Sequence, residues 1–243
     1  MKTTIIYLNV TKSGYPGASP AEYYIPYSKR WVDTYKRFDP GTEHDVRIVS
    51  CGAAPTDATV EMYSSIKHTW DSYLGAGSDI GACQYAMKNV DADFVVCMST
   101  PVYFWKAGWL KKLVDAREFF GDGIYGPMAS YQNRPHIRTS CWCVDPKTFA
   151  AYPHLIDNRE KCAWAESFDH NNEGWQISDW YANKGKVALL VTWDQVADRD
   201  HWRTPDNIFR RGDQSNCPVW DQHVDKYFSA HYHERLAFEK QAD

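Results

Sequence analysis

The sequence predicts a single-domain α/β fold, in which a mixed and mostly parallel sheet is flanked by helices. Three observations lead to this prediction. Short runs of apolar and β-branched residues alternate with segments of helical pattern along most of the chain. The chain has 243 residues, which is enough to bury a large core in one domain. No internal repeat and no low-complexity linker divides it.

The elements of the first half follow one another in a regular order. The apolar run 4–10 is the first predicted strand, and a loop rich in Gly, Pro and Ser follows it. A helix with aromatic residues on one side is predicted at 23–38, and a second strand at 45–50. Two helices at 62–74 and 80–90 then precede a wholly apolar run at 94–98, the pattern of a strand buried on both faces.

The second half continues the alternation. A helix rich in Lys, Leu and Arg is predicted at 109–120, and a later helix at 173–184 is ended by Gly185. Three further strands are predicted at 126–131, 139–144 and 187–193. Because ligands of parallel sheets bind beyond the carboxyl ends of the strands, we expect the site at the loops after Val10, Ser50 and Met98.

Composition excludes some functions and suggests others. The formal net charge is −4, from 27 Lys plus Arg and 31 Asp plus Glu. The sequence has no long basic run, so a surface for non-specific nucleic-acid binding is not indicated. Aromatic residues make up 15% of the chain, with 11 Trp and 16 Tyr. Aromatic rings stack well on the apolar faces of sugars, although an aromatic core would explain the same composition equally well.

The seven cysteines are odd in number and contain no Cys-x-x-Cys pair. Cys141 and Cys143 have strand spacing, so we expect both thiols on one face as small buried groups rather than as zinc ligands. The N-terminus lacks the apolar run of a signal peptide, and no stretch reaches the ~18 apolar residues of a membrane span. These features predict a cytoplasmic protein.

The glycine-rich segment from Gly75 to Gly81 partly matches a dinucleotide-binding fingerprint. Its third glycine falls one residue too late, and no convincing strand precedes it directly. A Rossmann oxidoreductase is therefore disfavoured.

The order of several motifs resembles another family, the GT-A glycosyltransferases. A Gly-Ser-Asp-Ile-Gly-Ala-Cys-Gln-Tyr-Ala helix, an Asp-Ala-Asp-Phe-Val-Val strand and the Trp109-Leu110 pair resemble its nucleotide-binding half. Arg138-Thr139-Ser140 before a strand, Glu166 to Asp169 before a helix and Gly185 before a strand resemble the acceptor half of small bacterial and phage enzymes. The likeness spans roughly residues 1–215. It implies one GT-A-like domain over 1–243, with a nucleotide-sugar half at 1–120, an acceptor half at 121–230 and a C-terminal tail at 231–243.

One departure from this family concerns the metal. The family usually carries an Asp-x-Asp at the end of the central strand, where it grips a divalent ion on the donor diphosphate. Here that strand ends in Cys97-Met98-Ser99, and thiol and thioether groups are poor ligands for Mg²⁺. Asp91 and Asp93 lie before the strand, where a solvated turn is the favoured interpretation. We therefore assign neither a metal ligand nor a cofactor. A divalent metal bound by other residues is the alternative.

The donor diphosphate then needs cations from the protein. Arg210 and Arg211 lie in a polar loop with a composition suited to phosphate, and an ordinary solvated turn is the alternative. Arg138, with His136, is a second cationic candidate. Asp79 is expected either to bind the donor nucleoside or to stabilise its own turn. The resemblance adds Ser99 to the donor site, because it stands at the end of the central strand.

The acceptor hydroxyl needs a base, and three carboxylates are crowded ahead of a predicted helix. Asp169 and Glu166 are the expected catalytic residues, by their match to the acceptor-side acid of the family. Helix capping is the alternative role for each of them, and the favoured one for Glu173.

The resemblance therefore implies an inverting glycosyltransferase in a bacterial or phage-infected cell. Its donor would be a nucleotide sugar such as a UDP-sugar, and its acceptor a glycan or a hydroxymethylated base in phage DNA. The alternative is a catalytically inactive sugar-binding or scaffold domain of the same fold, since loss of Asp-x-Asp is what such a protein would show.

Overall fold

The computed structural model describes residues 1–12, 19–167, 174–203 and 214–242. Within them, the main sheet has eight strands in the order β10-β9-β5-β8-β4-β1-β2-β3. Six of these run in one direction, while β8 and β10 are antiparallel to their neighbours. The predicted mixed, mostly parallel sheet is confirmed. The strands are β1 (Thr3–Val10), β2 (Asp45–Cys51), β3 (Thr69–Tyr73), β4 (Phe94–Met98), β5 (Gly123–Gly126), β8 (Cys141–Val144), β9 (Val187–Val191) and β10 (Val196–Ala197).

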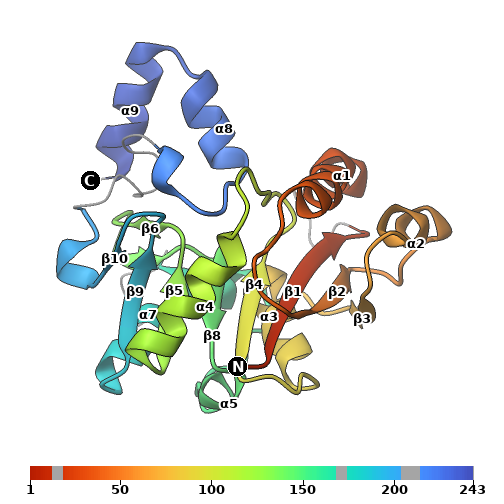
Figure 1. The fold of residues 1–243 in the computed structure, drawn as a ribbon, viewed down its shortest axis with the longest axis horizontal. Helices are drawn as coiled ribbons and strands as arrows, with labels where there is room; N and C mark the ends of the chain where they lie inside the picture. The colour runs from red at the N-terminus through yellow and green to blue at the C-terminus, as the bar shows by residue number, and fades with distance from the viewer. Residues whose placement is uncertain (13–18, 168–173, 204–213, 243) are drawn as a thin grey trace.

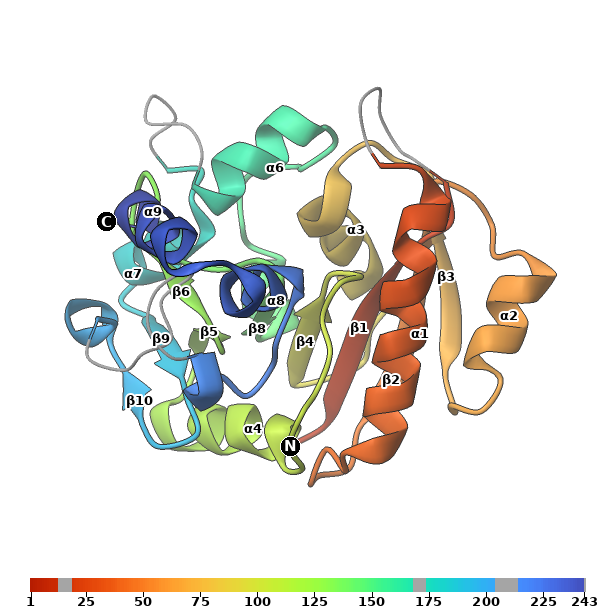
Figure 2. The same cartoon turned by 90° about the horizontal axis from the view of Figure 1, so that it is seen from above.

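Helices cover both faces of this sheet. Figure 2 shows α1 and α4 on one side of the strands, and α3, α6 and α7 on the other. Two helices, α8 and α9, stand over the carboxyl edge of the sheet (Figure 1). A small pair of strands, β6 (Ala129–Ser130) and β7 (His136–Ile137), lies outside the main sheet. The described helices are α1 (Ala21–Arg37), α2 (Asp57–Tyr63), α3 (Ser78–Met87), α4 (Trp109–Phe120), α5 (Pro146–Phe149), α6 (Arg159–Glu166), α7 (Ile177–Asn183), α8 (Gln222–Ser229) and α9 (Tyr232–Ala242).

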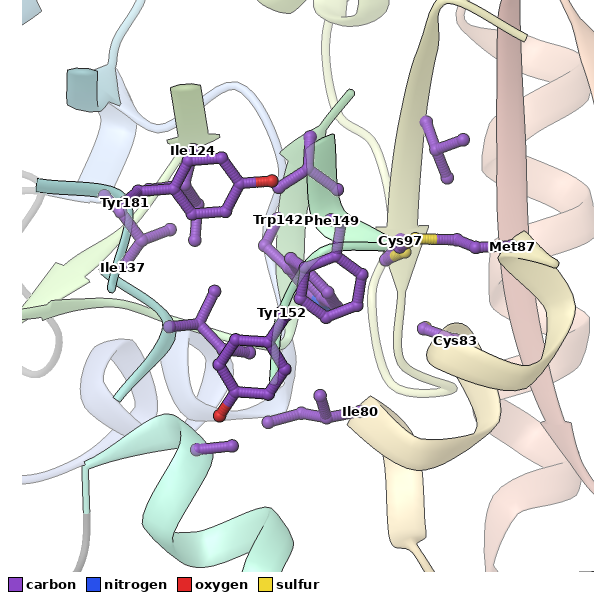
Figure 3. Close-up of a cluster of buried hydrophobic side chains, with 14 of the residues drawn as sticks. Ile80, Cys83, Met87, Cys97, Ile124, Ile137, Trp142, Phe149, Tyr152 and Tyr181 are labelled. Atoms are coloured by element: carbon purple, nitrogen blue, oxygen red, sulfur yellow. The ribbon is translucent and has the colours of Figure 1, made fainter. Parts of the chain in front are cut away.

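The core forms two layers because neighbouring strand residues point to opposite faces. In β1, Ile5 packs with the α1 and α4 side, and Ile6 packs with the α3 side. Figure 3 shows the second layer, in which Met87 of α3 lies beside Cys97 of β4 and Ile80, at the start of the same helix, lies near Tyr152. All five residues of β4 are buried, as its apolar sequence predicts. Cys141 and Cys143 share one face of β8, which confirms their predicted role as small buried groups.

The prediction of one helix over 62–74 is wrong. The helix α2 ends at Tyr63, and residues Thr69–Tyr73 form β3 instead. This segment contains Trp, Tyr and Thr, which favour strands, and it pairs in parallel with β2. An ion pair of 2.8 Å between Arg47 and Asp71 joins the two strands. The segment thus becomes an edge strand because of a partner that is distant in sequence.

The C-terminal half differs from the predicted elements in two places. Glu166 precedes α7, as predicted, but it is also the last residue of α6, a helix that was not predicted from the sequence. Its N-cap signal was Asn158, whose side chain accepts a hydrogen bond from the amide of Lys161 at 2.9 Å. The helix predicted at 173–184 is the shorter α7, and residues Tyr232–Ala242 of the C-terminal tail form α9. None of the described helices is both long and apolar enough to cross a membrane.

Candidate functional site

A cavity of about 250 Å³ opens at the carboxyl ends of the parallel strands. Its floor comes from the ends of β1, β2 and β4, the three places that the parallel-sheet rule predicts. The turn before α3, the end of α6 and the first turn of α8 provide further walls. The lining residues from the strand ends are Val10, Lys12, Cys51, Gly52, Tyr73, Ser99, Thr100 and Pro101.

Four of the predicted site residues meet in this cavity: Asp79, Ser99, Arg138 and Glu166. They come from the turn before α3, the end of β4, the segment before β8 and the end of α6. Asp169, Arg210 and Arg211 lie outside the described residues.

Arg138 and Glu166 form a largely buried ion pair. Arg138 Nη1 lies 2.8 Å from Glu166 Oε1, and the side chains are 9% and 13% exposed. Burial alone would raise the pKa of Glu166, but the charge of Arg138 and hydrogen bonds from Thr139 outweigh it. The pKa of Glu166 therefore lies below its ordinary value, and the group is ionised at neutral pH. Two residues that were predicted for opposite sides of the reaction thus neutralise each other's charge.

His136 does not provide the positive charge that was predicted for it together with Arg138. Its ring is fully buried, and Nδ1 lies 2.7 Å from the carbonyl oxygen of Arg134. Burial lowers the pKa of His136 to about 4, and the nearby Arg138 charge acts in the same direction. The Glu166 carboxylate, 4.0 Å from Nε2, opposes this shift without reversing it. His136 is therefore neutral near pH 7.

Asp79 lies in the first turn of α3. Its Oδ1 accepts hydrogen bonds from the amide of Ile80 at 3.0 Å and from the thiol of Cys162 at 3.1 Å. Burial and the charge of Glu166 raise the pKa of Asp79 despite these hydrogen bonds. The cavity thus holds two carboxyl groups whose surroundings move their pKa values in opposite directions, an arrangement typical of sites that handle protons.

The glycine-rich turn before Asp79 has a strand directly before it, contrary to expectation, because β3 ends at Tyr73. Its glycines serve close packing. A Cβ added at Gly77 would lie 2.1 Å from the carbonyl oxygen of Ile156, and one at Gly81 would lie 2.4 Å from it. The amide of Gly77 donates a hydrogen bond to the Tyr73 hydroxyl at 2.9 Å. The turn is thereby fixed between β3 and the chain before α6.

Ser99 directly follows β4 and is hydrogen-bonded to Ser140, the residue before β8. Its amide and its hydroxyl both donate to the carbonyl oxygen of Ser140, at 2.9 and 3.2 Å. The next residue, Thr100, is held by the hydroxyl of Tyr7, which donates to its carbonyl oxygen at 2.9 Å. These contacts fix the cavity floor, and a Ser hydroxyl can still accept a hydrogen bond from a ligand.

Several residues of the cavity wall were not predicted from the sequence. Lys12 follows β1 and adds a cation, and its signal was the polar loop predicted at that strand's end. Asp221 and His223 come from the first turn of α8, where Asp221 is the N-cap residue. An Asp ahead of a helical pattern is a capping signal, but it does not predict which cavity that helix will reach.

The helix starts also shape the electrostatics of the cavity. Residues at the beginning of α1, α3 and α8 all line it. The N-caps of α1 and α3, Pro20 and Gly77, make no side-chain capping hydrogen bond. Helix N-termini carry a partial positive charge, so the starts of α1 and α3 favour an anionic group in this cavity, whereas the start of α8 is already capped by the Asp221 carboxylate.

The carboxylates before β4 lie at the other edge of the sheet. Lys2 Nζ binds Asp91 Oδ2 at 2.8 Å, and the backbone amide of Lys2 donates to Asp93 Oδ2 at 3.0 Å. This arrangement confirms the predicted solvated turn. Within the described ranges, no group of three or more His, Cys, Asp or Glu side chains is arranged to hold a metal ion.

No protein-family model matches the chain, and no curated protein matches it either. The chain is similar to several solved structures over part of its length. For HddC from Yersinia pseudotuberculosis, the identity is 11%, the match covers 64% of this chain and 82% of HddC, and the TM-score is 0.45. For TarS from S. aureus, the identity is 14%, the match covers 63% of this chain and 30% of TarS, and the TM-score is 0.45.

A third similar structure is the mannosyltransferase PcManGT from Pyrobaculum calidifontis. Here the identity is 13%, the match covers 64% of this chain and 49% of PcManGT, and the TM-score is 0.44. PcManGT was solved with GDP-Man and Mn²⁺, and TarS with UDP-GlcNAc. The similar structures thus include an enzyme of the class that the sequence resemblance names. At these identities and TM-scores, the likenesses carry no argument about what this chain binds or catalyses.

Proposed function

We propose that this chain is a glycosyltransferase that moves a sugar from a nucleotide-sugar donor, such as a UDP-sugar, to a hydroxyl acceptor. One observation carries the proposal: Asp79, Arg138 and Glu166 meet in one cavity at the carboxyl edge of a mostly parallel sheet. Ligands of such sheets bind at that edge. The three residues come from separate elements, so local structure alone does not explain why they meet.

The donor diphosphate is an anion, and the cavity suits an anion on one side. Lys12 provides a positive charge there, and the helix dipole adds a partial positive charge at the start of α3. Arg138 also lines the cavity, and a guanidinium group is well suited to bind phosphate. In this proposal Arg210 and Arg211 also bind the diphosphate, Asp79 binds the nucleoside, and Ser99 contributes its hydroxyl.

The proposed reaction is a single displacement with inversion. A carboxylate takes the proton of the acceptor hydroxyl while that oxygen attacks the anomeric carbon. The bond from this carbon to the diphosphate oxygen breaks, and its electron pair leaves with the diphosphate. Glu166 is ionised and lines the cavity, so it can accept the proton. Its pairing with Arg138 weakens it as a base, which favours Asp169 as the base and Glu166 as the group that orients Arg138.

We further propose that catalysis does not depend on an Asp-x-Asp metal site. The strand β4 ends in Cys97 and Met98, Ser99 follows it, and the Asp91-Ala92-Asp93 motif lies at the opposite edge of the sheet. Turnover in excess EDTA should therefore fall less than about tenfold. A larger loss that Mn²⁺ restores would show that other residues supply a metal.

The acceptor in this proposal is a glycan, with a hydroxymethylated base in phage DNA as the other candidate. The net charge of −4 favours the glycan, because DNA is a polyanion. We place the protein in the cytoplasm, since its seven cysteines are all free thiols.

The proposal is tested with a panel of nucleotide sugars, each incubated with the protein and read by mass spectrometry. One donor should be hydrolysed slowly to its nucleoside diphosphate, and faster when a suitable glycan is added. The Asp79→Asn variant should lose this activity, whereas Asp91→Asn, at the far edge of the sheet, should keep it.

The same panel also tests the alternative, that the chain is a catalytically inactive sugar-binding domain. Such a domain would bind a sugar or nucleotide sugar in calorimetry without consuming it. If no member of the panel is bound or consumed, the proposed function is wrong.

A further inference from the structure

The first turn of α8 contains a buried carboxylate whose hydrogen bonds are incomplete. Asp221 is 2% exposed and lines the cavity. Its Oδ1 caps the helix by accepting hydrogen bonds from the amides of His223 at 2.8 Å and Val224 at 3.3 Å. Its Oδ2 is shielded from solvent and has no hydrogen-bond partner in the described part of the chain. Buried polar atoms are nearly always paired, so this oxygen calls for a partner.

The turn is held firmly at the cavity. Arg30 of α1 binds Asp225 of α8 at 2.6 Å, and its guanidinium lies 3.3 Å from the centre of the Tyr103 ring. Tyr103 belongs to the chain that leaves β4, and its hydroxyl donates to the same Asp225. Backbone hydrogen bonds also join Tyr103 and Trp220, just before the turn. The position of Asp221 is therefore set by contacts of α8 with α1 and with the chain that leaves β4.

Charge decides which part of a nucleotide sugar can lie against this turn. A second negative group beside Asp221 would be repelled, so the diphosphate belongs near the cation Lys12. A carboxylate oxygen is a strong acceptor for hydroxyl groups, and His223 and Gln222 beside it add further polar groups. The ligand group that suits this turn is therefore neutral and rich in hydroxyls.

We propose that the first turn of α8 is the sugar-binding wall of the site, with Asp221 Oδ2 accepting a hydrogen bond from a hydroxyl of the donor sugar. This inference rests on the proposed function and adds a specificity-determining residue to it. The nucleotide and diphosphate are bound by the strand-end loops and by the start of α3, and the sugar by α8.

The decisive variant is Asp221→Ser. Serine caps a helix about as well as aspartate, but its single oxygen is used in the cap, so the second acceptor is lost. His223→Ala is a second variant that leaves the capping residue in place. The matched control is Asp198→Ser, because Asp198 caps the short helix Arg199–His201 and does not line the cavity. Circular dichroism and thermal unfolding show which variants are folded.

Calorimetry then compares each nucleoside diphosphate with its nucleotide sugar. The probes are UDP with UDP-glucose and UDP-N-acetylglucosamine, and GDP with GDP-mannose. For the sugar that the wild type binds, Asp221→Ser should raise Kd about tenfold, equal to ~1.4 kcal/mol. The Kd of the matching diphosphate should change less than about twofold in this variant, and Asp198→Ser should change neither.

The results separate the inference from the function on which it rests. If both α8 variants bind the nucleotide sugar like the wild type, the inference is wrong and the proposed function survives. An equal loss of affinity for diphosphate and nucleotide sugar would also overturn it, because the turn would then act on the nucleotide or on folding. If the wild type binds none of the probes, the proposed function itself fails.

Discussion

Replacing Glu166 by Gln tests the centre of the site, because it removes the charge that balances Arg138. The two groups are 2.8 Å apart and at most 13% exposed. Removing one partner of a buried pair leaves an uncompensated charge, at a cost of about 3–5 kcal/mol. Since both side chains line a cavity that admits water, we expect the lower value, about 3 kcal/mol. For a chain of this length, Tm changes by roughly 2–4 °C per kcal/mol, so Glu166→Gln should lower Tm by about 6–12 °C.

The assay is thermal unfolding of a double-mutant cycle that contains Glu166→Gln, Arg138→Gln and the double variant. The double variant should recover part of the loss, because no unpaired charge remains in it. Activity is measured well below the melting range. If Glu166 is the catalytic base, Glu166→Gln should lower kcat roughly 10²–10⁴-fold with little change in donor affinity. Asp169→Asn is measured beside it, and the same fall is expected there if Asp169 is the base.

A Tm for Glu166→Gln within about 1 °C of the wild type would refute the role of the ion pair. Strictly additive losses in the double variant would refute it as well. If Glu166→Gln and Asp169→Asn both turn over normally, the proposed inverting mechanism has no base, and a retaining mechanism or an inactive domain becomes the better explanation.

Three further predictions follow from individual contacts. The ordinary pKa of His136 is 6.5 and its folded value is about 4, so the unfolded state binds a proton first as pH falls. Stability should be full above pH 6.5 and decline by about 3 kcal/mol towards pH 4, and His136→Gln should flatten this profile in urea unfolding. Gly77→Ala should lower Tm by several degrees, because its Cβ would meet the Ile156 carbonyl oxygen at 2.1 Å; an unchanged Tm would mean that the turn can move. The single variants Arg30→Asp and Asp225→Arg should each cost about 1 kcal/mol or less, since the pair is partly exposed, and the charge-swapped double variant should regain stability in the same urea assay.

Much of the architecture can be predicted from local patterns. The alternation of strands and helices implies a parallel sheet, and a parallel sheet determines the edge where ligands bind. The wholly apolar strand 94–98 matches β4 residue for residue, because a strand buried on both faces tolerates no polar side chain. Cys141 and Cys143 lie on one face because side chains alternate along any strand. In each case the physical cause lies within a few residues of the chain.

The tertiary structure decides which distant groups meet. The segment 69–73 is a strand because β2 offers it a pairing edge, and its local pattern had suggested a helix. Arg138 and Glu166 were assigned to opposite sides of a reaction, yet α6 brings them into one ion pair and changes the charge and basicity of both. Asp221 joins the cavity only because α1 and the chain after β4 hold α8 above it. The sequence by itself determined the kinds of elements and the edge of the sheet that carries the site. The partners and charge states of the site residues depend on long-range packing, which no local pattern encodes.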